Sequence, residues 1–218
     1  MSVRLAVFDC DGTLTDGQAG VVAAMDAAFA AIGASAPPHG EVRRIVGLSL
    51  PQAVRHLSPT LPEGDQRRVV DAYKAAFRAS REDGSLREPL YPGMADLLRD
   101  LHRQGWLLAV ATGKSDRGLA ATLAAHDLER LFCALHTADR HPSKPHPAML
   151  EAAIAEAGAR RQDTVMIGDT VYDMQMAGAA GVRAIGVDWG YHEAEELRAA
   201  GAIGVAQDAD ALRAMIDG

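Results

Sequence analysis

The stretch VFDCDGTLTD, residues Val7 to Asp16, decides how the rest of the chain is interpreted. The mostly apolar run from Val3 to Phe8 predicts a buried β-strand. This strand ends on Asp9 and Asp11, whose side chains would point to the same side if the strand continued. Two carboxylates held so close repel each other, so the pair persists only where a cation or a reaction uses it. An ordinary turn built from Asp and Gly is the alternative that this stretch alone leaves open.

The composition is that of a soluble globular protein. Of its 218 residues, 48% are hydrophobic and 23% are charged. No apolar run approaches the roughly 18 residues that span a bilayer, and Asp9 interrupts the first strand too early for a signal peptide. The two cysteines, Cys10 and Cys133, predict no disulfide framework. We therefore expect a cytoplasmic location and no membrane partner.

The charge narrows the class of partner. A net charge of −7 disfavours a nucleic-acid surface, which would need a basic stripe. An anionic small molecule stays compatible with this charge if positive groups gather at one site. The chain has only three lysines, Lys74, Lys114 and Lys144, among 22 basic residues, so each lysine is a candidate for a special role. Both a monomer and a homodimer stay open.

The pattern along the chain divides it into two parts. Residues 16–88 show helical spacing with connectors rich in Pro, Gly and Ser, and no convincing strand. From Tyr91 onward helices alternate with apolar strands, predicted at 106–111, 132–136, 164–167 and 182–187, and two short helices finish the chain. This alternation predicts an α/β fold, a Rossmann-like parallel sheet with helices on both faces. The sheet would comprise residues 1–15 and 89–218, with an all-helical domain, 16–88, inserted between its first two strands.

Polar residues follow the predicted strands at the edge where a parallel sheet binds ligands. The strand 106–111 is followed by Thr112, Gly113 and Lys114. The strand 164–167 precedes Asp169 and Asp173, and the loop HPSKPHP carries Lys144. Together with Asp9 and Asp11, these groups are expected to converge on one site.

The chemistry of these groups indicates a phosphate and a metal ion. Asp9, Asp169 and Asp173 offer the carboxylate oxygens that Mg²⁺ prefers, although aspartates in a first helical turn also serve as caps. Thr112, the N–H of Gly113 and Lys144 can bind phosphate oxygens. Asp9 can then attack phosphorus to form an aspartyl-phosphate. Asp11 can protonate the leaving oxygen and later activate water.

Four motifs carry a family resemblance. DCDGTLTD, ATGK, the lysine of SKPHP and GDTVYDM occur in the order found in the haloacid dehalogenase-like hydrolase superfamily. The chain resembles its phosphoglycolate phosphatase-like branch over nearly its whole length outside the helical insert. The resemblance implies that residues 16–88 form a mobile helical cap that closes over the site and selects the substrate.

The resemblance also implies a role for each motif residue. Asp9 would be the nucleophile and a Mg²⁺ ligand, and Asp11 the acid/base, with its backbone carbonyl on the metal. The remaining expected contacts are Thr112 and Lys144 on the phosphate, the amides of Cys10, Asp11 and Gly113 at the phosphoryl group, and Asp169 and Asp173 at the metal, Asp173 directly or through water.

These assignments predict a Mg²⁺-dependent phosphatase for a small phosphorylated metabolite, with 2-phosphoglycolate favoured. A phosphomutase, or a pyrophosphatase, sugar-phosphate phosphatase or nucleotide phosphatase of the same fold, is the alternative. A binding module without catalysis is disfavoured because every catalytic position is filled. Four residues are candidates for reading the substrate: Arg43, Arg44, Gly47 and Lys114. For Lys114, a salt bridge to a site carboxylate is an equal alternative.

Overall fold

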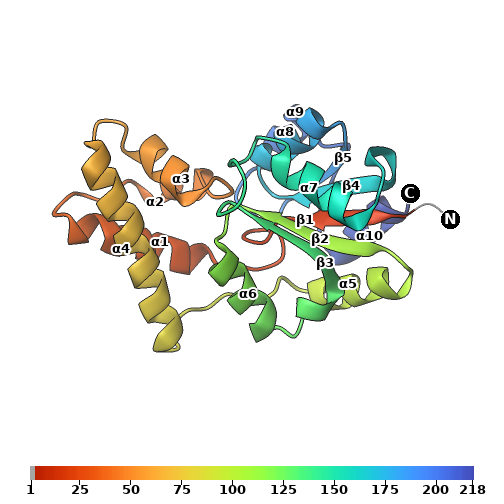
Figure 1. Cartoon of the computed structure of the whole chain (residues 1–218), viewed down its shortest axis with the longest axis horizontal. Helices are drawn as coiled ribbons and strands as arrows, with labels where there is room; N and C mark the ends of the chain where they lie inside the picture. Colours follow the sequence, from red (N-terminus) through yellow and green to blue (C-terminus); the bar gives the residue numbers. More distant parts are fainter. Residues whose placement is uncertain (1–2) are drawn as a thin grey trace.

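A parallel β-sheet forms the body of the molecule (Figure 1). The computed structural model describes residues 3–218, and within them the sheet has six strands in the order β3-β2-β1-β4-β5-β6. All of its pairings are parallel. The strands are β1 (Leu5–Phe8), β2 (Leu107–Thr112), β3 (Phe132–Thr137), β4 (Thr164–Gly168), β5 (Arg183–Val187) and β6 (Gly204–Ala206).

Helices cover both faces of this sheet because the strands are apolar on both sides. In β1, Ala6 and Phe8 pack into one hydrophobic cluster, and Leu5 and Val7 pack into the other. The first cluster is closed by α5 (Met94–Arg103), α6 (Asp116–Ala125) and α10 (Ala209–Asp217). The second is closed by α7 (Ala148–Ala157), α8 (Val171–Ala180) and α9 (Ala194–Ala199). The predicted fold class, a Rossmann-like parallel sheet with helices on both faces, is confirmed.

Four further helices lie together beyond the carboxyl ends of the strands, at the left of Figure 1. They are α1 (Gln18–Ala31), α2 (His39–Arg44), α3 (Leu50–Leu57) and α4 (Glu63–Glu82), and we call them the four-helix insert. The insert has an apolar core of its own, in which Met25, Phe29, Val54 and Val69 are buried. The connecting chain crosses between insert and body near Thr15 and Leu90, which form an isolated antiparallel bridge.

None of the helices described for residues 3–218 combines the length and the apolar character that crossing a membrane requires. The predicted cytoplasmic location itself stays a prediction.

Candidate active site

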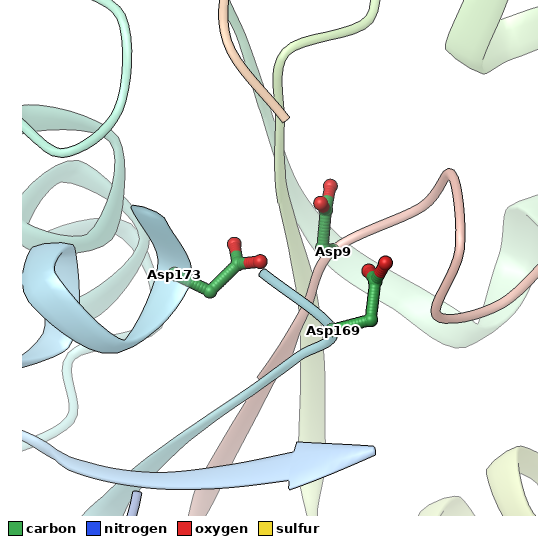
Figure 2. Close-up of side chains that lie close together, drawn as sticks. All are labelled: Asp9, Asp169 and Asp173. Atoms are coloured by element: carbon green, nitrogen blue, oxygen red, sulfur yellow. The ribbon is translucent and has the colours of Figure 1, made fainter. Parts of the chain in front are cut away.

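Three buried aspartates meet at the carboxyl edge of the sheet (Figure 2). Asp9 follows β1, Asp169 follows β4, and Asp173 lies in the first turn of α8. Because β1 and β4 are neighbours with Phe8 opposite Ile167, the residues after the two strands are brought side by side. One carboxylate oxygen from each aspartate lies within 4.8 Å of the others.

The Asp169 carboxylate is held by the turns around it. Its Oδ1 accepts a hydrogen bond of 2.7 Å from the Thr13 hydroxyl, and its Oδ2 accepts one of 2.9 Å from the Tyr191 N–H. Gly12 has a φ of +85°, and a Cβ there would lie only 2.1 Å from Asp169 Oδ2. A side chain at Gly12 would thus both strain the backbone and displace this carboxylate.

Asp173 is oriented by the start of α8. Thr170 is the N-cap and accepts a hydrogen bond from the Asp173 N–H, while Asp173 Oδ2 accepts from the N–H of Thr170 at 3.1 Å. This capping box fixes one carboxylate oxygen of Asp173. The other oxygen, Oδ1, stays directed at the site. Asp173 thus caps α8 with one oxygen and contacts Lys144 with the other, so the capping role is shown and leaves a role at the metal possible in geometry.

Lys144 is the cation of this cluster. Its Nζ lies 2.9 Å from Asp9 Oδ2 and 2.6 Å from Asp173 Oδ1, and its side chain is completely buried. The two carboxylates outweigh the effect of burial and raise the pKa of Lys144, so it stays charged. Lys144 reaches the site from the loop between β3 and α7, as the sequence analysis expected.

The cluster carries more negative than positive charge. Three buried carboxylates face one ammonium group, and burial together with the neighbouring Asp173 raises the pKa of Asp9 to about 6 despite Lys144. Burial and the charges of Asp9 and Asp173 also raise the pKa of Asp169. Oxygen donors with excess negative charge match a hard divalent cation, so the residues present fit Mg²⁺.

The expected phosphate-binding groups lie beside Asp9. The Cys10 N–H donates to Asp9 Oδ1 at 2.6 Å, and burial raises the pKa of the Cys10 thiol, which therefore stays protonated. Thr112 ends β2 and is buried, and its hydroxyl oxygen accepts a hydrogen bond from the Lys114 N–H. A Cβ at Gly113 would lie 2.6 Å from the carbonyl oxygen of Gly47, so this turn passes against the insert.

A cavity of about 450 Å³ lies between the insert and the edge of the sheet. Asp9, Asp11, Thr112, Gly113 and Lys114 line its inner end. The two expected reacting groups, Asp9 and Asp11, therefore line one cavity, whereas Lys144, Asp169 and Asp173 are buried behind its wall.

Comparison with known proteins places this site in a family. The model of the family described as haloacid dehalogenase-like hydrolase matches residues 6–187 of the chain. The chain belongs to this family. Its membership confirms the prediction that the protein is an enzyme of the hydrolase class.

Several named relatives of this hydrolase are phosphatases. "Probable phosphatase IndB" from Dickeya dadantii is 38% identical over 90% of this chain and 86% of its own length. Phosphoglycolate phosphatase 1 from Pseudomonas aeruginosa is 33% identical over 89% of this chain and 72% of its own. A crystal structure of a predicted phosphatase from Clostridium acetobutylicum has a TM-score of 0.88 and 26% identity, and covers 99% of each chain. These names agree with a phosphoric monoester hydrolase.

A second ionic cluster surrounds Asp11. Lys114 Nζ donates to Asp11 Oδ1 at 2.6 Å and to Glu88 Oε1 at 2.8 Å. Arg81, from the end of α4, pairs with the other oxygen of Glu88 at 2.7 Å. Burial raises the pKa of Asp11, and Lys114 opposes that rise. Of the two roles considered for Lys114, the structure shows the salt bridge to a site carboxylate.

The arginines expected to read the substrate lie elsewhere. Arg44 forms an ion pair of 2.6 Å with Glu196 on α9, and its carbonyl oxygen accepts a hydrogen bond from the Tyr172 hydroxyl. Arg43 is exposed, and neither arginine lines the cavity. The reason is that Val42 faces the insert's core, which directs its neighbours outward. Gly47, the third candidate, does line the cavity.

Three residues that the sequence analysis did not select take part in the site. Thr13 binds Asp169, while Glu88 and Arg81 complete the pairing of Lys114. Thr13 lies inside the first motif, so its position was a usable signal. Glu88 and Arg81 belong to an ordinary polar stretch of helix and linker, where only the folded chain shows what they contact.

Proposed function

We propose that this hydrolase is a Mg²⁺-dependent phosphatase that cleaves a phosphomonoester through an aspartyl-phosphate on Asp9. The observation that carries the proposal is the position of Asp9: it lines the cavity, and beside it lie Lys144 and two further buried carboxylates. A carboxylate in such surroundings is a nucleophile next to the groups that neutralise a phosphate.

Asp9, Asp169 and Asp173, with the backbone carbonyl of Asp11, would hold the metal ion. When bound, Mg²⁺ would offset the charge of the phosphate oxygens and so favour attack by a carboxylate. Thr112, Lys144 and the N–H of Gly113 bind the phosphate. Their hydrogen bonds orient phosphorus toward Asp9.

In the first step a carboxylate oxygen of Asp9 attacks phosphorus, and the bond between phosphorus and the alcohol oxygen breaks. Asp11 gives its proton to that oxygen, so the product leaves as a neutral alcohol. Burial raises the pKa of Asp11, which favours the protonated form that this step needs.

In the second step water attacks phosphorus and the bond to Asp9 breaks. Asp11 takes the proton of the attacking water, which returns both aspartates to their starting states. Inorganic phosphate then leaves through the cavity.

The four-helix insert would act as a cap in this cycle. The proposed domain division is a cap of residues 16–88 and a body of residues 1–15 and 89–218, and it is supported by side chains of the insert that line the cavity. Opening and closing of the insert would admit the substrate and exclude bulk water during the reaction. A cytoplasmic enzyme, active as monomer or homodimer on a small phosphorylated metabolite, fits this proposal.

The test is phosphate release with Mg²⁺, beginning with 2-phosphoglycolate because of the named relatives. Pyrophosphate, hexose phosphates and nucleoside monophosphates belong in the same panel. We expect chelation of divalent cations to stop the release, and Asp9→Asn to lower it by about 10⁴-fold or more. Asp16→Asn, the same substitution at an exposed position, is the matched control.

Undiminished turnover in Asp9→Asn would refute Asp9 as the nucleophile. Dependence on a bisphosphate activator, with transfer of phosphate within the substrate, would identify a phosphomutase instead.

A further inference from the structure

The side chains that line the cavity indicate the chemical nature of the substrate's leaving group, the alcohol. Beyond its inner end the cavity is lined by the insert, from α1, α3, α4 and the loop before α3, and on the side of the body by the start of α6 and the turn after β3. The apolar wall belongs to the insert. The side chains there are mainly apolar or aromatic and include Val21, Met25, Val46, Leu50, Tyr73 and Phe77.

Two aromatic side chains lie on the same face of α4. Tyr73 and Phe77 are one helical turn apart, and their rings stack with centroids 5.5 Å from each other. Phe77 also lies close to the reaction centre, because Lys114 Nζ, which binds Asp11, is 5.7 Å from the centre of its ring. A leaving group that receives its proton from Asp11 would therefore contact the Phe77 ring through the atoms next to its alcohol oxygen.

The positive groups near this end are already paired. Lys114 binds Asp11 and Glu88, and Arg81 binds Glu88. Lys74, Arg78 and Arg117 also line the cavity, but all three residues are exposed, so their charged ends can stay in water.

From these contacts we infer that the substrate is a phosphomonoester of an uncharged alcohol with an apolar or aromatic body. This inference deepens the proposed phosphatase function and rests on it. A cavity of about 450 Å³ falls within the range that holds ligands of drug-like size. A leaving group such as glycolate has two carbon atoms and a carboxylate, so it would leave the apolar wall uncovered. Its carboxylate would lose hydration wherever it lay against that wall.

Three phosphate esters test the inference in the wild-type protein with Mg²⁺. Benzyl phosphate presents an uncharged aromatic alcohol, 2-phosphoglycolate presents a carboxylate, and 2-hydroxyethyl phosphate has the size of the glycolate ester without its charge. We expect kcat/KM to be highest for benzyl phosphate and at least about 10-fold above that for 2-phosphoglycolate, because the ring is removed from water in the transition state. The hydroxyethyl ester should fall between them.

A ratio of benzyl phosphate to 2-phosphoglycolate below about 10 would overturn the inference and leave the phosphatase function standing. Release of phosphate from none of the three esters, nor from any ester in the wider panel, would overturn the phosphatase proposal and this inference with it. The two failures are thus distinguishable.

Two variants locate the preference in the cavity wall. Phe77→Ala should lower the ratio of the two kcat/KM values at least about fivefold, whereas Arg68→Ala, on the same helix but outside the cavity, should leave the ratio unchanged. Leu50→Lys places a cation at a partly exposed wall position and should move the ratio toward 2-phosphoglycolate. An unchanged ratio in a folded Phe77→Ala protein, or in Leu50→Lys if Phe77→Ala does not fold, would contradict the assignment.

Discussion

Two lysines, Lys144 and Lys114, hold carboxyl groups at this site, but the charge around them differs. Lys144 lies among Asp9, Asp169 and Asp173, so one ammonium group faces three carboxylates. We call this set the Lys144 cluster.

Lys114 lies between Asp11 and Glu88, and Arg81 completes the pairing of Glu88. These four residues form the Lys114 cluster, in which two basic side chains pair with two carboxyl groups. Burial would raise the pKa of Glu88, but Lys114 and Arg81 outweigh it and lower that pKa.

The difference in charge distinguishes a cluster that needs a bound cation from one whose charged side chains are paired with each other. Buried like charges are costly unless a counter-charge is supplied, so the Lys144 cluster is expected to take up a cation. The Lys114 cluster satisfies itself and joins Asp11 to α4 and to the linker that carries Glu88. The first cluster would perform chemistry with a metal ion, and the second would position the acid/base.

The largest effect is expected from removing the cation of the Lys144 cluster. Lys144→Met leaves three buried carboxylates without their ammonium partner, which should destabilise the metal-free protein by about 3–5 kcal/mol. Phosphate release should fall by about 10²- to 10³-fold, because a group that stabilises the transferring phosphate is lost. Urea unfolding and a phosphate assay measure the two effects.

Lys74→Met is the control for stability, since Lys74 is exposed and its loss should cost less than about 0.5 kcal/mol. Equal stability of the Lys144 and Lys74 variants would mean that the carboxylates of the cluster do not repel each other.

The next effect concerns the metal ion itself. Mg²⁺ at 100 times its dissociation constant should stabilise the wild-type protein by about 2.7 kcal/mol. Asp169→Asn keeps the shape of the side chain but removes one negative ligand, so most of this stabilisation should disappear. Thermal unfolding with and without Mg²⁺ measures it. A full Mg²⁺ effect in this variant would exclude Asp169 as a ligand.

A smaller effect is expected in the Lys114 cluster. Glu88→Gln removes one charge from a nearly buried pair and should destabilise the protein by about 1–3 kcal/mol. The stabilisation by Mg²⁺ should stay as in the wild type, because Glu88 belongs to the self-satisfied cluster. Glu82→Gln, the same substitution at an exposed position at the end of α4, is the control. Loss of Mg²⁺ binding in Glu88→Gln would show that the Lys114 cluster is coupled to the metal site.

The smallest effect belongs to the exposed pair between insert and body, Arg44 and Glu196. The hydrogen bond from Arg44 lowers the pKa of Glu196 from 4.5 to about 2. A lowered folded-state pKa means that the pair contributes stability above pH 4.5 and loses it as the pH falls toward 2.

Because both side chains are solvated, this contribution should stay below about 1 kcal/mol. In urea unfolding at pH 7, the free energy of unfolding should be higher for the wild type than for Glu196→Gln, and this difference should be smaller at pH 3. Glu195→Gln should show no such difference from the wild type. A gap that widens at pH 3 would contradict the ion pair.

The sequence was sufficient for the body of the fold because its signals are local. Apolar runs between polar turns place β2 and β4 within a residue or two, and Ser115 is the N-cap of α6, as its position before the helix suggests. The three-residue strand β6 was not predicted, because GVA between glycine-rich and polar residues is too short to give a pattern.

Within the site, the residues of the sequence motifs could be predicted, but the ion pairs between residues far apart in the sequence could not. Asp9 and Asp169 follow strands, and Lys144 lies in a loop at the sheet's carboxyl edge, so the topology of a parallel sheet brings them together. Asp173 joins them from the first turn of α8. The pairing of Arg44 with Glu196 joins positions 152 residues apart, and no local pattern predicts it.

The central claim is that the Lys144 cluster, and not the Lys114 cluster, takes up a divalent cation. A crystal structure of the wild-type protein with Mn²⁺ in place of Mg²⁺, located by anomalous scattering, tests this most directly. We predict one ion in contact with carboxylate oxygens of Asp9 and Asp169. An ion bound between Asp11 and Glu88, or none at Asp9 at saturating Mn²⁺, would contradict it.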